Sequence, residues 1–137
     1  MIRSTFLDDE PVLDIGCGDG KVTALLALSV PQGSVTGIDN SEKMISFAQE
    51  NFPSSRCPNS NFIRMDAADL IFREQFDVVY FNAALHWIKD RTSVLRGVEK
   101  SLKSSGRLLF QMGGKGNAKD ILDIVEALVS EDPWRFF

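Results

Sequence analysis

Short apolar runs alternate along this chain with segments in which apolar residues recur at helical spacing. The runs are predicted to be strands at residues 12–15, 34–39, 61–66, 76–81 and 107–112. Four segments between and after them show helical spacing, at Val22, Leu25 and Leu26, at Met44, Ile45, Ala48 and Phe52, at Val94, Leu95, Val98 and Leu102, and at Ile121, Ile124, Val125 and Leu128. Strands that alternate with helices predict an α/β fold built on a parallel sheet.

Polar residues and glycines mark the ends of these elements. Ser41 is expected to cap the second helix, Ser104-Ser105-Gly106 to end the third and Asn117 to cap the last. The strand at 61–66 has a polar residue in mid-run, which is typical of a sheet edge. The strand at 76–81 is the most continuously apolar, as expected for a strand covered on both faces.

The first strand runs directly into a glycine turn. Gly16, Gly18 and Gly20 follow it at every second position, and a missing Cβ lets the backbone turn tightly and lie against a ligand. The helix that follows presents unpaired backbone N–H groups and the positive end of its dipole. A strand, a glycine turn and a helix N-terminus in this order indicate a nucleotide site.

The spacing of the glycines helps to separate two classes of nucleotide cofactor. A dinucleotide fingerprint, GxGxxG, would need its third glycine at Lys21 or at Thr23, so neither frame fits. Asp14 comes before the turn, where a carboxylate would repel a pyrophosphate but would suit a cationic amino group. A nicotinamide-dependent oxidoreductase is therefore the less favoured alternative.

The run VLDIGCGDG, residues 12–20, resembles the first motif of the class I S-adenosylmethionine-dependent methyltransferases. This resemblance implies S-adenosylmethionine as the cofactor and S-adenosylhomocysteine as its product. It also implies a Rossmann-like, doubly wound, mainly parallel sheet with strand order 3-2-1-4-5. The family fold continues with two more strands, which this chain is expected to lack.

Two further acids end predicted strands. Asp39 lies 19 residues beyond Gly20 and could accept hydrogen bonds from both ribose hydroxyls, although a lone Asp there could equally be a turn or cap residue. By resemblance, Asp39 binds the ribose, Asp66 contacts the adenine amino group, and the Ala67 N–H reaches a ring nitrogen. Together with Asp14, these acids would lie along the carboxyl edge of one sheet, where ligands of open α/β folds bind.

The fourth strand ends in Asn82-Ala83-Ala84-Leu85-His86-Trp87, which resembles trans-aconitate methyltransferases and related small-molecule methyltransferases. The Asp/Asn-Pro-Pro-aromatic run of enzymes that methylate bases is absent here. His86 is the candidate catalytic base, with a structural histidine as the alternative. A carboxylate acceptor, ionised at pH 7, would need no base. The cofactor-binding set expected from the resemblance comprises Asp14, Gly16, Cys17, Gly18, Gly20, Asp39, Asn40, Met44, Asp66, Ala67, Asn82 and Trp87. For Met44 and Trp87, plain packing is the alternative.

Composition limits the class of protein and its partners. The 137 residues suffice for one domain, residues 1–137, with 44% hydrophobic and 25% charged residues. A net charge of −4 without any basic run disfavours nucleic acid as a partner, and no membrane span is indicated. The acidic, signal-free N-terminal segment and two unpatterned cysteines, Cys17 and Cys57, favour a cytoplasmic protein without disulfides or bound metal.

The chain ends with three aromatic residues, Trp134, Phe136 and Phe137, although chain ends are normally polar. We therefore expect a copy of the family fold that is incomplete at both ends. Its apolar fifth strand would lie at a sheet edge and could pair with a second copy. A fragment that binds S-adenosylmethionine without catalysis is the alternative to a small-molecule methyltransferase.

Overall fold

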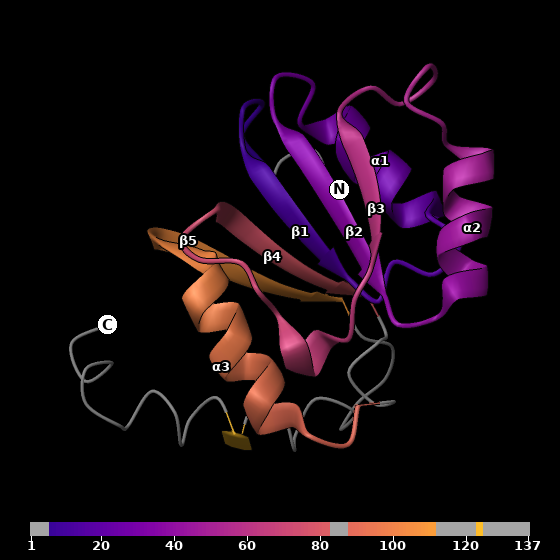
Figure 1. Cartoon of the computed structure of the whole chain (residues 1–137). Coiled ribbons are helices and arrows are strands. Elements are labelled where there is room, and N and C mark those ends of the chain that lie inside the picture. Colours follow the sequence, from indigo (N-terminus) through magenta and orange to yellow (C-terminus); the bar gives the residue numbers. More distant parts are fainter. Residues whose placement is uncertain (1–5, 83–87, 112–122, 125–137) are drawn as a thin grey trace.

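A computed structural model describes residues 6–82, 88–111 and 123–124 of the chain. Its elements are β1 Pro11–Ile15, α1 Lys21–Ser29, β2 Ser34–Asp39, α2 Glu42–Asn51, β3 Ser60–Arg64, the 3-10 helix η2 Ala67–Asp69, β4 Phe76–Asn82, α3 Arg91–Ser101 and β5 Leu102–Gln111, and Figure 1 labels all of them except η2. The strands form one parallel sheet in the order β3-β2-β1-β4-β5. This arrangement confirms the predicted α/β fold and strand order.

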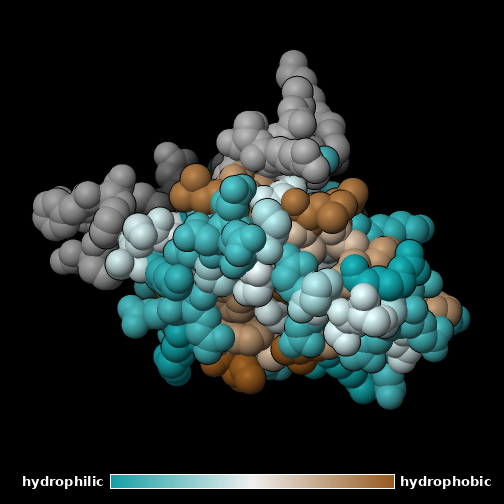
Figure 2. Space-filling view, turned by 90° about the horizontal axis from the view of Figure 1, so that it is seen from above, coloured by the Kyte–Doolittle hydropathy of each residue, from teal (hydrophilic) through white to brown (hydrophobic). Residues whose placement is uncertain are grey.

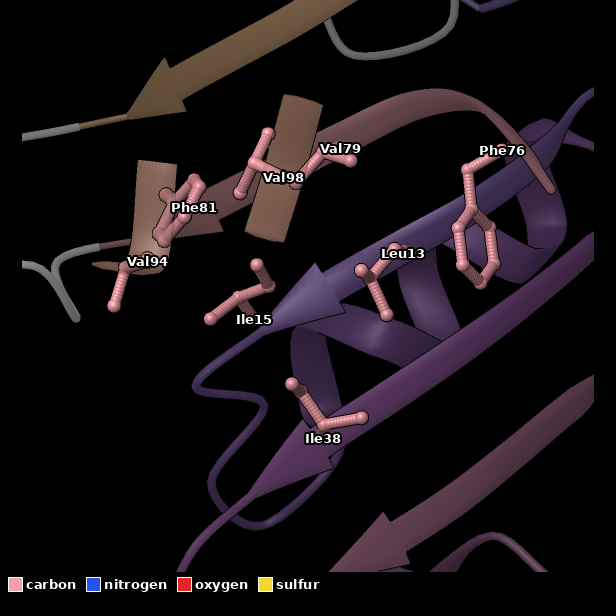
Figure 3. Packing of buried hydrophobic residues seen from close by; sticks show 8 residues of the cluster. All are labelled: Leu13, Ile15, Ile38, Phe76, Val79, Phe81, Val94 and Val98. Atoms are coloured by element: carbon pink, nitrogen blue, oxygen red, sulfur yellow. The ribbon is translucent and has the colours of Figure 1, made fainter. Parts of the chain in front are cut away.

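Helices cover both faces of the sheet (Figure 1). On one face, the eight residues shown in Figure 3 form a core with α3, namely Leu13, Ile15, Ile38, Phe76, Val79, Phe81, Val94 and Val98. On the other face, Val12, Val35 and Val78 of the sheet pack against Leu26 and Ala27 of α1. Because β1 and β4 are buried on both faces, their sequences are mainly apolar, with Asp14 in β1 and Asp77 in β4 as exceptions.

The buried face of α1 differs from the one that the apolar spacing predicts. Leu25 is 53% exposed, whereas Thr23 is fully buried together with Leu26. The side chains that point toward the sheet are therefore those at 23, 26 and 27, and a polar residue occupies the first of these positions. Thr23 is buried because it donates a hydrogen bond to a buried acid of β1. A hydrophobic pattern contains no signal for such a contact.

Three predicted boundaries are wrong by two residues or more: the end of α3, the start of β5, which is Leu102 rather than Arg107, and the end of β3. Helix α3 ends at Ser101 rather than near residues 104–106, because Leu102 already pairs with Phe76 as the first residue of β5. The register shifts between this pair and the next, Val78 with Arg107. Strand β3 ends at Arg64, two residues before Asp66. The glycine segment 113–116 lies outside the described residues, as does the last predicted helix apart from residues 123–124, which are helical.

The surface is mostly hydrophilic where it is seen from above, with hydrophobic residues in separate patches (Figure 2). Helix α1 contributes two exposed leucines, Leu25 and Leu28. Within the described ranges, none of the helices has both the length and the apolar character needed to cross a bilayer.

Candidate functional site

A pocket of about 330 Å³ lies at the carboxyl edge of the sheet. Its lining residues come from the ends of β1, β2 and β4 and from the segments that follow β3 and precede α3: Ile15, Gly16, Ile38, Asp39, Asn40, Met65, Asp66, Ala67, Asn82 and Ile88. In the order β3-β2-β1-β4-β5, the chain leaves β1 toward β2 on one side and returns to β4 on the other. Ligands of open α/β sheets bind at such a switch point.

Several N–H groups of the glycine loop between β1 and α1 donate hydrogen bonds to backbone carbonyl oxygens of the protein. The N–H groups of Gly16 and Cys17 both donate to the Ile38 carbonyl oxygen, each at 2.9 Å, and that of Gly20 donates to the Cys17 carbonyl oxygen at 3.0 Å. A phosphate would require such groups to be free and to point at the ligand. These three N–H groups are therefore not available to a phosphate, and Gly16 is the one glycine of the loop that lines the pocket.

Asp39 connects the glycine loop to the end of β2. One of its carboxylate oxygens accepts the Gly18 N–H at 3.0 Å, and the other accepts the Ser41 N–H at 2.9 Å. Each carboxylate oxygen can accept more than one hydrogen bond, so both remain able to bind ligand hydroxyls. The same side chain thus holds the loop in place and faces the pocket.

The segment after β3 forms another wall of the pocket. The Met65 N–H donates to the Asp39 carbonyl oxygen at 3.0 Å, which fixes this segment to the end of β2. Asp66 then caps η2 by accepting the Ala68 N–H at 2.9 Å. Two carboxylates line the pocket, and its described lining includes no Lys, Arg or His, so its electrostatic field favours a cationic ligand.

Asp14 lies behind the glycine loop and is not part of the pocket lining. It is 1% exposed, and one of its oxygens accepts the Thr23 hydroxyl at 2.6 Å. Burial raises the pKa of Asp14 to about 6; the Thr23 hydrogen bond opposes this shift, and the charge of Asp39 adds to it. The direct contact with an ammonium that the sequence suggests is not prepared in this structure, because the Asp14 side chain is buried and does not line the pocket.

The Cys17 side chain also points away from the pocket. It is 6% exposed and packs with Ile45, Ala48 and Phe62. Burial, with the neighbouring charges of Asp14 and Asp39, raises the pKa of its thiol well above the usual range. Cys17 is therefore a protonated core residue rather than a nucleophile.

The predicted cofactor-binding residues fall into three groups. Those on the pocket lining are Gly16, Asp39, Asn40, Asp66, Ala67 and Asn82. Those placed elsewhere are Asp14, Cys17, Gly18, Gly20 and Met44, of which Met44 is 37% exposed on α2. His86 and Trp87 lie outside the described residues.

Four apolar lining residues were not predicted from the sequence, namely Ile15, Ile38, Met65 and Ile88. Three of them directly precede Gly16, Asp39 and Asp66, so their position beside a predicted ligand residue was an available signal. Within the described part of the chain, no three His, Cys, Asp or Glu side chains are grouped so as to hold a metal ion.

Comparisons with known proteins agree with this geometry. A model of the family described as a methyltransferase domain matches residues 7–132. A trans-aconitate 2-methyltransferase of Rhodopseudomonas palustris strain BisA53 is 34% identical, over 98% of this chain and 51% of that protein. A malonyl-[acyl-carrier protein] O-methyltransferase of Priestia megaterium is 30% identical, over 88% and 43%. The chain thus spans about half the length of these curated relatives.

A solved structure supports the fold. The crystal structure of a SAM-dependent methyltransferase from Aquifex aeolicus matches with a TM-score of 0.80, over 92% of this chain and 75% of that one. Its sequence identity is 19%, so the match shows the fold but not the role of any residue.

Proposed function

Because the chain belongs to the methyltransferase domain family, we propose that it transfers a methyl group from S-adenosylmethionine to a small-molecule acceptor. The family match confirms the resemblance inferred from the sequence motifs and the expected cofactor. The observation that carries the proposal is the pocket at the switch point, with two carboxylates and no described cation in its lining. Such a pocket suits a ligand that is a cationic nucleoside without phosphates.

Five of the lining residues have proposed roles. Asp39 accepts hydrogen bonds from the ribose hydroxyls, and Asp66 with the Ala67 N–H binds the adenine edge. The backbone of Gly16 lies against the remainder of the cofactor, and Asn82 lies nearest the acceptor. When bound, S-adenosylmethionine would supply an electrophilic methyl carbon for transfer to an acceptor lone pair, with the sulfur leaving as the neutral thioether of S-adenosylhomocysteine. The protein's part is to align the two partners and exclude water.

We propose a carboxylate as the acceptor group. Two relatives are named for trans-aconitate and malonyl substrates, both of which carry carboxyl groups. A carboxylate is ionised at neutral pH and can attack without a base. On this proposal His86 is not required as a proton acceptor, and its catalytic role stays a prediction, as does a wall position for Trp87. A cytoplasmic location and the absence of a nucleic-acid partner also stay predictions.

The experiment that tests cofactor binding is a calorimetric titration of the chain with S-adenosylhomocysteine. We expect saturable binding that weakens at least roughly tenfold in Asp39→Asn, because hydrogen bonds to a charged group contribute about 1.5–3 kcal/mol. Asparagine keeps the shape of the side chain and one acceptor oxygen for the backbone. Asp9→Asn removes the same charge at an exposed position and should leave the affinity unchanged.

Parallel arms separate the alternatives. No binding of S-adenosylhomocysteine by a folded chain, or equal binding of NAD, would contradict the proposal. Binding of S-adenosylhomocysteine without methylation of any carboxylate, hydroxyl or amine acceptor would favour the non-catalytic alternative. The engaged N–H groups of the glycine loop lead us to expect no NAD binding.

We also propose that copies of the chain associate through β5. In the part of the chain that the structure describes, β5 pairs with β4 and forms an edge of the sheet. Its residues Leu108, Leu109 and Phe110 are half-buried, so an added strand would cover further apolar surface. Sedimentation velocity should show a sedimentation coefficient that rises with concentration. A monomer throughout the accessible range would exclude this association.

A further inference from the structure

Asp14 is a buried acid that none of the proposed ligand contacts uses. One of its oxygens is held by Thr23, and the other, Oδ1, has no hydrogen-bond partner among the residues that the structure describes. The next two residues, Ile15 and Gly16, line the pocket. A largely uncompensated acid therefore lies directly behind the pocket wall.

The groups around Asp14 come from every element packed against it. Thr23 reaches it from α1, the Cys17 thiol lies in the glycine loop, Asp39 ends β2, and Tyr80 of β4 is its pairing partner in the sheet. Burial is the main cause of the raised pKa of both Cys17 and Tyr80, and the charge of Asp14 adds to each shift. None of these neighbours is a cation, so the negative charge of Asp14 acts on the pocket without an opposing charge from them.

We propose that Asp14 is a specificity-determining residue that makes the pocket prefer S-adenosylmethionine over S-adenosylhomocysteine. This inference rests on the proposed function. The two ligands differ by one methyl group and by the positive charge of the sulfonium. A buried negative charge stabilises the charged ligand through space and gives the neutral thioether no such stabilisation. Asp14 therefore favours the replacement of bound S-adenosylhomocysteine, the product, by S-adenosylmethionine.

Asp14 carries this role better than Asp39. Both oxygens of Asp39 already accept backbone N–H groups, which spread its charge, and its side chain faces the open pocket. Asp14 is 1% exposed, where charges interact more strongly because water is excluded. Gly37 makes this arrangement possible, since a Cβ there would lie 2.9 Å from the Cys17 Cβ and 3.0 Å from the Thr23 hydroxyl.

The preference should depend on pH with a definite sign. With a pKa of about 6, Asp14 is ionised near pH 7.5 and protonated near pH 5. The preference for S-adenosylmethionine is thus present above the pKa and lost as the pH falls through it. Binding of the cationic ligand near pH 6 should also release a proton, which calorimetry in buffers of different ionisation enthalpy detects.

The test measures the affinities of both ligands by calorimetry, without an acceptor, near pH 7.5 and near pH 5. In Asp14→Asn, which keeps the Thr23 hydrogen bond, the preference for S-adenosylmethionine near pH 7.5 should fall about tenfold. The preference should then no longer change between the two pH values. Asp9→Asn should retain both the preference and its pH dependence.

Thr23→Val provides a second readout. It keeps the charge of Asp14 but removes the hydrogen bond that holds its pKa down, so the midpoint of the pH dependence should move upward. An unchanged preference for S-adenosylmethionine in Asp14→Asn overturns the inference. If Asp14→Asn does not fold, an unchanged midpoint of the pH dependence in Thr23→Val overturns it. Failure of both ligands to bind the unaltered chain would instead overturn the proposed function.

Discussion

At the scale of single residues, the three glycines of the loop have three different surroundings. Gly16 lines the pocket. Gly18 has a φ of 54°, and a Cβ added there would meet nothing within 4 Å. Gly20 has a φ of 86°, and its added Cβ would lie 2.9 Å from both the Ala48 Cβ and the Phe62 ring. The three glycines are regularly spaced in the sequence, but each is needed for a different reason: Gly16 for the approach of a ligand, Gly18 for the backbone conformation and Gly20 for packing as well.

We predict that Gly20→Ala destabilises the chain more than Gly18→Ala. Both substitutions force alanine into the left-handed region, at about 1–2 kcal/mol. Only Gly20→Ala also overpacks the contact between α1, α2 and β3, which adds about 1–3 kcal/mol. Urea unfolding at a common m-value measures the difference. Equal losses of stability would show that the Gly20 contact relaxes freely.

The same scale explains which site residues the sequence could predict. Asp39 and Asp66 line the pocket as predicted, because Asp39 ends β2, Asp66 lies two residues beyond β3, and the carboxyl ends of parallel strands meet at one edge. Asp14 was predicted to bind the cofactor and Ile15 was not. Successive side chains of a strand point to opposite faces of the sheet, so only one of these two neighbours can face the pocket. Ile15 therefore lies on the α3 side and reaches the pocket, whereas Asp14 lies on the α1 side with Thr23.

At the scale of elements, the segment before β1 is joined to β5 across the intervening strand β4. The Arg107 guanidinium donates to both carboxylate oxygens of Glu10, at 2.5 and 2.8 Å. Glu10 is 4% exposed and also accepts the Leu7 N–H at 2.9 Å. The Arg107 hydrogen bond, partly opposed by burial, lowers the pKa of Glu10. This pair contributes to fixing the order of β1, β4 and β5.

We predict that Glu10→Gln lowers the free energy of unfolding by about 1–2 kcal/mol near pH 7, because it leaves a bidentate pair incomplete. Asp77→Asn, which disrupts the more exposed pair with Lys103, should lower it by under about 1 kcal/mol. Since the pKa of Glu10 is lowered in the fold, its contribution is lost as the pH falls through that value. The free energies of unfolding of the unaltered chain and of Glu10→Gln, measured as a function of pH, should therefore converge in acid.

The elements that the sequence predicted poorly are those fixed by distant partners. Strand β2 was predicted with its observed bounds because its pattern is local. The end of α3 could not be predicted, since Leu102 continues the helical spacing but pairs with Phe76, which lies 26 residues earlier in the chain. Likewise, the exposed position of Leu25 follows from the sheet contacts of Thr23, which no period in the sequence encodes.

At the scale of the whole molecule, the pocket joins parts of the chain that are far apart in sequence. Its lining begins at Ile15 in β1 and ends at Ile88 before α3, with contributions from β2, β4 and the segment after β3. A ligand that contacts all of them binds only the assembled sheet, because unfolding separates its walls. Ligand binding should therefore stabilise the fold as a unit rather than one loop of it.

We predict that S-adenosylhomocysteine at about one hundred times its Kd raises the free energy of unfolding by about 2.7 kcal/mol. For a domain of 137 residues, this corresponds to an increase in Tm of roughly 10 °C, measurable by thermal melting followed by circular dichroism. Asp39→Asn at the same ligand concentration should show a smaller increase, and NAD should show none. An equal increase in Asp39→Asn would place the ligand outside the pocket at the carboxyl edge of the sheet, because Asp39 connects the glycine loop and β2 there.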